Sequence, residues 1–193
     1  MIDAAENPLG LDGFEFAEFT SPEPERMVEL LEQLGFVAYA KHPTKDVVRY
    51  KQGDISLLVN REATGQAADF RADHGPSANG MAFRVADAAK AYELALERGA
   101  RPAEAAAGAL GPDAKVLQGI GGSLLYLIDR YGDHGSVYDD WTPIPGADAA
   151  EALNNAGLKV LDHLTHNVRR GQMRTWSTFY SQVFGFTEQK YFD

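Results

Sequence analysis

One structural unit begins three times in this sequence, at residues 13–36, 79–100 and 161–186. Each copy opens with a short run of strand-forming residues, passes through a polar turn, continues as an amphipathic helix and stops at a glycine. Because neighbouring copies of a repeated unit bury their apolar faces together, this repeat constrains the fold more than any other feature. It predicts tandem copies of one α+β unit.

Apolar residues in each copy recur at the spacing i, i+3, i+4, i+7, which predicts a helix with one buried face. The three sets are Met27, Leu30, Leu31 and Leu34; Ala88, Ala91, Tyr92 and Ala95; and Trp176, Phe179, Tyr180 and Val183. A glycine follows each set, where a left-handed residue often ends a helix. These glycines are Gly35, Gly99 and Gly185.

The starts of the first two helices also carry signals. Ser21 and Asp87 are the expected N-caps, since a short polar side chain can accept a hydrogen bond from a free backbone N–H group of the first turn. Pro22 is expected at the first helical position, where its missing N–H group costs nothing.

A hairpin is expected after each of these two helices. Residues 47–60 read as two strands around Gly53, and residues 115–129 as two strands around the GIGG run. The GIGG run is not interpreted as a phosphate loop, because the strand-like SLLYLID follows it rather than a helix. The repeated unit is therefore βαβββ, and the fold class is α+β.

The repeat also divides the chain. Residues 8–141 hold two complete units and are expected to form a paired βαβββ domain. Residues 142–157 contain the proline, glycine and asparagine of a linker. Residues 158–193 begin a third unit, so the sequence predicts that the chain ends part-way into it.

Composition narrows the class of protein. The chain is 45% hydrophobic and carries a formal charge of −10, which disfavours binding to nucleic acid or to an anionic membrane surface. It has no cysteine, so a metal would have to bind histidine, carboxylate or water. The first residues lack the pattern of a signal peptide, and no apolar run is long enough to span a bilayer. We therefore expect a cytoplasmic protein.

The third copy opens with LDHLTHNV (161–168), which contains two of the five histidines. Since the other copies open with strands, we expect a strand here, with successive side chains on opposite faces. His163 then lies on a polar face and is the candidate metal ligand, whereas His166 lies on the packing face. Asp162 falls on the face opposite His163 in a regular strand, so no contact between the two is expected.

The other two copies have no equivalent ligand. Phe14 and Gly80 stand near the place of His163 when the copies are aligned on their helices, and neither binds metal. The remaining histidines, His42, His74 and His134, lie in turn sequences and are expected at the surface. The first two units are thus expected to be a non-catalytic scaffold.

Several long stretches resemble one known family. They are NPLGLDGFEFAEFTSP, HGPSANGMAFRVAD, GIGGSLLYLIDRYG and GLKVLDHLTHNVRRGQM, and the likeness runs from about residue 6 to the end. On these motifs the chain is identified as similar to the 4-hydroxyphenylpyruvate dioxygenase family of vicinal-oxygen-chelate proteins.

The resemblance implies a catalytic half that binds one non-haem Fe(II) through two histidines and a glutamate. His163 matches the first of those histidines, and the other two ligands would lie beyond Asp193. The implied reaction converts an aromatic 2-oxo acid, 4-hydroxyphenylpyruvate, and O2 into homogentisate and CO2, in tyrosine catabolism. A homo-oligomer is expected, and the 193-residue chain alone is expected to be inactive.

Two alternatives stay open at this point. A 4-hydroxymandelate synthase would share the fold, the iron site and the substrate, but would hydroxylate the side chain. A non-catalytic ligand-binding module would need polar or aromatic groups that converge in the first domain, whereas Phe14, Phe16 and Ala82 predict a filled core.

The aromatic stripe of the third helix poses a separate question, because the strands that would cover it are not in this sequence. Residues 158–193 are therefore expected to be disordered, swapped onto a neighbouring molecule or docked on the first domain.

Overall fold

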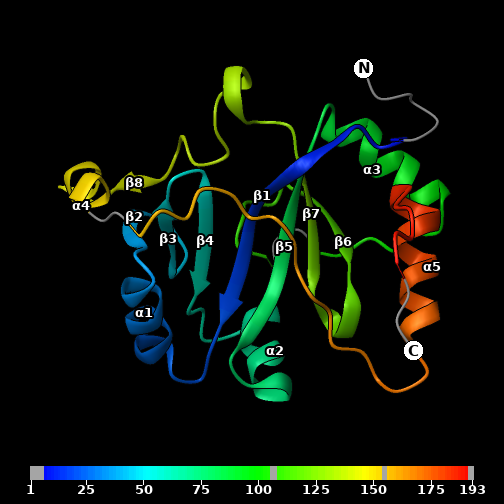
Figure 1. Cartoon of the computed structure of the whole chain (residues 1–193), viewed down its shortest axis with the longest axis horizontal. Helices are drawn as coiled ribbons and strands as arrows, with labels where there is room; N and C mark the ends of the chain where they lie inside the picture. Colours follow the sequence, from blue (N-terminus) through cyan, green and yellow to red (C-terminus); the bar gives the residue numbers. More distant parts are fainter. Residues whose placement is uncertain (1–6, 105–107, 154–155, 191–193) are drawn as a thin grey trace.

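The computed structural model describes residues 7–104, 108–153 and 156–190, and within them a single mixed sheet has the strand order β6-β7-β5-β1-β4-β3-β2-β8 (Figure 1). The strands are β1 (Leu11–Thr20), β2 (Val37–Lys41), β3 (Val47–Gln52), β4 (Ile55–Asn60), β5 (Ser77–Val85), β6 (Lys115–Gln118), β7 (Leu124–Ile128) and β8 (Thr142–Pro143). The α-helices are α1 (Pro24–Gln33), α2 (Gln66–His74), α3 (Ala88–Glu97), α4 (Ala147–Leu153) and α5 (Met173–Phe184). Among the described residues, no helix is both long and apolar enough to cross a membrane.

The sheet is built from two copies of the predicted unit. In the first copy β1 pairs in parallel with β4, and in the second β5 pairs in parallel with β7. The copies join where β1 and β5 run antiparallel at the centre of the sheet. The tandem α+β arrangement is thus confirmed. In the second copy the strand expected after the helix is reduced to one bridge between Pro102 and Leu117, which is formed by bonds from the Ala103 N–H group to the Val116 carbonyl and from the Gln118 N–H group to the Arg101 carbonyl.

Helix boundaries follow the sequence signals with one exception. The Asp87 side chain accepts a hydrogen bond from the Lys90 backbone N–H group, as expected of an N-cap. The start of α1 was predicted two residues too early: the helix begins at Pro24, and Ser21 instead accepts from the Glu23 backbone N–H group. Glu23 precedes a proline, which disfavours the helical conformation, and its φ and ψ of −120° and 72° are not helical, so the helix begins after it. Gly35, Gly99 and Gly185 all have positive φ angles, as predicted.

One face of the sheet carries α1, α3 and α5. In Figure 1, α5 lies beside α3 at one side of the sheet and α1 lies at the other. The α5 side chains of Val183 and Phe184 are only 2% and 1% exposed, and Phe184 lies 5.3 Å from Phe83 of β5 between ring centroids. Of the three outcomes expected for residues 158–193, the described part shows docking on the first domain.

The opposite face of the sheet, which we call the inner face, is filled by side chains. Phe16 and Ala82 are fully buried there, as predicted, together with Tyr126, Tyr138 and Trp141. The expectation was wrong for one residue. Phe14 lies on the helix-bearing face, where it stacks on Phe83, because the pairing of β1 with β5 shifts register between Phe14 and Phe16.

A buried carboxylate lies within the inner face. Glu18 of β1 is 0% exposed, and its Oε1 accepts hydrogen bonds of 2.8 Å from the side-chain amides of Asn60 and Asn79. Its Oε2 accepts a bond of 2.5 Å from the Tyr126 hydroxyl, which in turn accepts from the Ala109 backbone N–H group at 2.9 Å. These bonds join β1, β4, β5 and β7. Burial and the neighbouring Glu18 raise the pKa of Tyr126 well above its usual value.

Part of the predicted linker is attached to the sheet. Within residues 142–153, β8 pairs with β2 and α4 follows it. The Tyr39 hydroxyl donates to Asp148 of α4, and Lys51 lies 2.6 Å from the Glu151 carboxylate. These contacts fix the described linker residues to β2 and β3, while the domain boundary itself stays a prediction.

The sequence did not predict α2. Ala67 is its one buried residue, so the helix shows no apolar stripe of the kind that marks α1 and α3. It is held instead at the ends of the central strands, where the Thr20 hydroxyl donates to the Ala67 carbonyl.

We expect Tyr126→Phe to lower the free energy of unfolding by about 1–3 kcal/mol, because Glu18 Oε2 and the Ala109 N–H group lose their buried partner. Urea unfolding measures the change. Tyr92→Phe is the control, since Tyr92 is only partly buried and its hydroxyl forms no hydrogen bond with any described residue. Equal stability of the two variants would show that the Glu18 bonds contribute nothing.

We expect Phe184→Ala to weaken the docking of α5 by about 3–5 kcal/mol, the usual cost of removing a buried phenyl ring. Amide hydrogen exchange should then be faster in α5 while β1 and β5 stay protected. Phe186→Ala is the control, because Phe186 is 41% exposed. A uniform loss of protection across the sheet would contradict independent docking of α5.

Candidate metal centre

The candidate ligand His163 lies on a segment without regular secondary structure. Residues 156–169 form neither helix nor strand, so the strand predicted over 161–168 is wrong. In Figure 1 this segment crosses in front of the sheet on its way from α4 to α5. Two hydrogen bonds attach the start of the segment to the end of β3 and the turn after it. The Asp54 N–H group donates to the Lys159 carbonyl, and the Leu158 N–H group donates to the Gln52 side chain.

The strand fails to form because no other strand lies beside it. Within the part of the chain that the structure describes, the backbone groups of residues 160–168 have no backbone hydrogen-bond partner. A strand depends on such partners. The edge strands of the sheet, β6 and β8, do not pair with this segment.

From His163 to Val168 the side chains alternate between exposed and half-buried as predicted, although no strand forms, whereas Asp162, predicted on the packing face, is exposed. Leu164 packs against the core, and His166 and Val168 are half-buried. His163 and Thr165 between them are exposed. The two histidines therefore differ in environment, as the sequence predicted, and do not form one two-histidine site.

His163 is accessible and has one polar neighbour. Its side chain is 79% exposed, and its ring Nδ1 lies 2.8 Å from the Asp162 carboxylate. The expectation that Asp162 points away from His163 was wrong, because it assumed the regular backbone of a strand. No described residue forms a hydrogen bond to His163 Nε2, so this nitrogen is free to bind a ligand from solvent.

His166 is a packing residue. Its ring lies edge-on to Tyr180 of α5 at 5.5 Å between centroids, and its Nε2 is 3.4 Å from the Tyr180 hydroxyl. Burial lowers the pKa of His166 below its usual value of 6.5 and raises the pKa of Tyr180. The neutral ring is therefore the form that fits between the segment and α5.

The other three histidines either bond to backbone groups near them or are exposed. His42 Nδ1 accepts hydrogen bonds from the backbone N–H groups of Thr44 and Lys45, and His74 Nε2 lies 3.1 Å from the Gly121 carbonyl. His134 is exposed in a short turn. Among residues 7–104, 108–153 and 156–190, no three histidine or carboxylate side chains come together to hold a metal. The described residues therefore bring no further ligand to the candidate His163.

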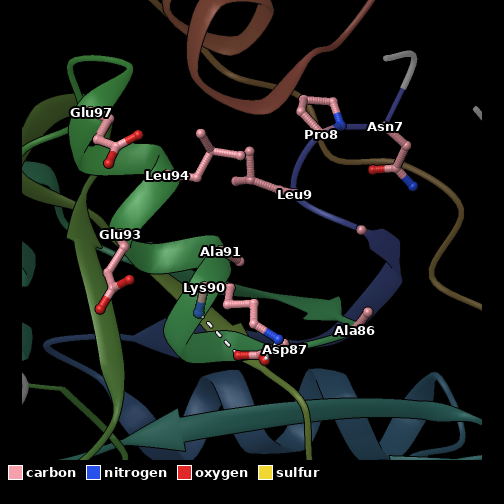
Figure 2. Close-up of a pocket in the computed structure, with 11 residues that line it drawn as sticks. Asn7, Pro8, Leu9, Ala86, Asp87, Lys90, Ala91, Glu93, Leu94 and Glu97 are labelled. Carbon is pink, nitrogen blue, oxygen red and sulfur yellow. Dashed lines mark hydrogen bonds and ion pairs between the residues drawn. The ribbon is translucent and has the colours of Figure 1, made fainter. Parts of the chain in front are cut away.

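Two hollows at the surface of the molecule do not contain His163. The first, about 570 Å³, lies between residues 7–10 and α3. Figure 2 shows Leu9 and Leu94 facing each other across it and Lys90 paired with Asp87 at one end. The second, about 300 Å³, lies between the end of α1, β2 and α4. Both lack a histidine, so these hollows add no ligand to the candidate site.

Comparison with known proteins bears on the whole chain. A family model described as hydroxyphenylpyruvate dioxygenase, N-terminal, matches residues 5–142. A curated 4-hydroxyphenylpyruvate dioxygenase from Pseudomonas sp. (strain P.J. 874) is 48% identical over 99% of this chain and 53% of its own length. One from Pseudomonas aeruginosa is 47% identical over 97% of this chain and 53% of its own length. The chain spans about half the length of the curated relatives it matches.

Two solved structures share the fold. A fusion protein of a xylose isomerase-like TIM barrel and a 4-hydroxyphenylpyruvate dioxygenase superposes with a TM-score of 0.76 at 29% identity, covering 92% of this chain and 28% of that one. A mutant of 4-hydroxymandelate synthase from Streptomyces coelicolor gives a TM-score of 0.69 at 21% identity, covering 94% and 55%. At that lower identity the likeness concerns the fold alone.

The environment of His166 should be visible in its titration. Since burial disfavours the charged ring, the folded pKa lies below the unfolded value of 6.5. The stability that His166 contributes to docking is complete above that value and is lost as the pH falls from it through the folded pKa. We expect NMR of the ring protons to give a midpoint below 6.5, rising toward 6.5 in Tyr180→Ala, which removes the covering ring. An unchanged midpoint in that variant would contradict the assignment.

Proposed function

The chain belongs to the family described as hydroxyphenylpyruvate dioxygenase, N-terminal, and from this premise we propose that it is part of a non-haem Fe(II) dioxygenase. The proposed reaction converts 4-hydroxyphenylpyruvate and O2 to homogentisate and CO2. The observation that carries the proposal is the 48% identity to a dioxygenase of that name over 99% of the chain, including the segment around His163. The proposed setting is tyrosine catabolism in the cytoplasm, in a homo-oligomer.

His163 is the ligand that this chain would contribute. An imidazole nitrogen suits Fe(II), and the free Nε2 of an exposed ring can reach a metal without rearrangement of the core. Bound iron would hold the 2-oxo acid and activate O2, chemistry that ordinary side chains do not supply. The other two ligands would come from residues outside this sequence.

The first two units would act as a scaffold. Their inner face is filled by Phe16, Tyr126 and Trp141 and so leaves no room for an aromatic substrate. This packing also disfavours the reading of the first domain as a ligand-binding module. On its helix-bearing face the domain instead holds α5 and the segment with Leu164, and thereby supports the neighbourhood of His163.

A chimera tests this proposal, made by joining residues 1–193 to the part of the Pseudomonas sp. dioxygenase that follows the aligned region. With Fe(II), ascorbate, O2 and 4-hydroxyphenylpyruvate we expect homogentisate, identified by mass spectrometry. His163→Ala should lower the rate at least about 100-fold, because a ligand is lost. The matched control, His134→Ala, removes an exposed histidine in a distant turn and should leave the rate unchanged.

Three results would count against the proposal. A folded chimera that forms no homogentisate would reject it, and hydroxymandelate as the product would favour the alternative synthase. The unjoined 193-residue chain is the second control and should give no product, because it offers one candidate ligand. Homogentisate from this chain alone would show that the metal ligands had been misassigned.

A further inference from the structure

The helix α4, at the β2 edge of the sheet (Figure 1), is too short and too poor in large apolar residues to hold itself in place. It has seven residues, and a helix of that length is not stable alone in water. Ala147 is its one buried residue, and Leu153 at its end is 87% exposed. On the side of α1 and β2 a hollow of about 300 Å³ leaves its apolar contacts incomplete. Apolar burial therefore contributes little to its attachment.

Two acidic side chains attach α4 instead. Asp148 and Glu151 are three residues apart and so lie on the same face of the helix. Asp148 accepts a hydrogen bond from the Tyr39 hydroxyl of β2. Glu151 accepts bonds of 2.8 Å and 2.6 Å from Lys51 Nζ of β3, and one of 3.0 Å from the Gly53 N–H group. We call these four hydrogen bonds the clasp.

The local backbone of β2 and β3 places the partners of α4. The pairing of these strands shifts register between Ala38 and Ala40, and such an irregularity can redirect the side chain between them, here Tyr39. Gly53 has a φ of 56°, a conformation that glycine adopts easily, and its N–H group reaches α4 from this turn. Lys51 Nζ lies 4.9 Å from the centroid of the Tyr39 ring, so the two parts of the clasp are in contact.

The ion pair in the clasp is shielded from solvent. The side chains of Lys51 and Glu151 are 24% and 18% exposed, whereas those of the Lys90–Asp87 pair on α3 are 84% and 40% exposed. Water and salt weaken a shielded pair less than an exposed one, and its hydrogen bonds are charge-assisted. Loss of either partner also leaves the other charge partly buried and unpaired. The Lys51–Glu151 pair is therefore the strongest part of the clasp.

We propose that α4 is a releasable strap: the clasp holds it to β2 and β3, and when the clasp is broken α4 detaches as a unit while the sheet stays folded. α4 is the last described helix before the third unit, so its release lengthens the free link between the first domain and that unit. Every contact of the clasp lies within residues 39–151. The strap therefore depends neither on the proposed metal site nor on the structure of residues 158–193.

Amide hydrogen exchange of the intact 193-residue chain, resolved by NMR, tests the strap. Glu151→Ala should speed exchange in α4 about tenfold, the usual effect of losing a hydrogen bond to a charged group, and leave β3 and β4 protected. Alanine favours helix more than glutamate does, so helix propensity cannot cause this change. Lys51→Met should act like Glu151→Ala, whereas Lys51→Arg keeps the charge and should keep most of the protection. The matched control is Glu97→Ala, at an exposed position of α3.

Salt gives a second readout, because it screens an ion pair and does not weaken apolar contacts. Raising NaCl from about 0.05 M to about 1 M should speed exchange in α4 severalfold in the wild type, but not in Glu151→Ala, where the pair is already absent. Equal exchange in α4 of the wild type and Glu151→Ala would overturn the proposal. So would a loss of protection across β3 and β4 in that variant, or the same response to salt in both proteins.

Discussion

A single buried carboxylate holds the junction of the two repeated units. Glu18 lies on β1, and its bonding partners Asn60, Asn79 and Tyr126 lie on β4, β5 and β7. Removing a carboxylate from water costs several kcal/mol unless donors replace the lost hydration, and here three neutral donors do so. Through Ala109 the same cluster also holds the covering loop against the inner face. The Glu18 bonds therefore join the strands whose apolar side chains fill the inner face of the first domain.

The candidate ligand His163 lies on the other side of the sheet from the filled inner face. The segment with His163 crosses the helix-bearing face, and Phe184 of α5 fixes its far end against Phe83. His163 is thus exposed between Leu161 and Leu164, which pack against the core.

Local signals in the sequence predicted most of the fold. The repeat, the hairpins, the Asp87 cap and the helix-ending glycines all depend on neighbouring residues, and the structure confirms them. The features that the sequence did not predict correctly depend on contacts with distant residues or on irregular backbone geometry. α2 is held by contacts with strand ends, the 161–168 strand lacks a neighbour, and the Asp162–His163 contact depends on a backbone that no periodicity describes. His163 was identified as a candidate because its face could be inferred from alternation alone.

The central claim is that the metal-binding chemistry of this chain belongs to the segment at His163 and not to the filled domain beside it. Titration of the ¹⁵N-labelled 193-residue chain with Co²⁺, a paramagnetic substitute for Fe(II), tests this most directly. We expect line broadening that begins at Asp162–Thr165 and leaves the amides around Glu18 and Tyr126 unchanged. Broadening centred on Glu18 and Tyr126 would instead place a metal site in the inner face of the first domain and rule out the assignment to the His163 segment.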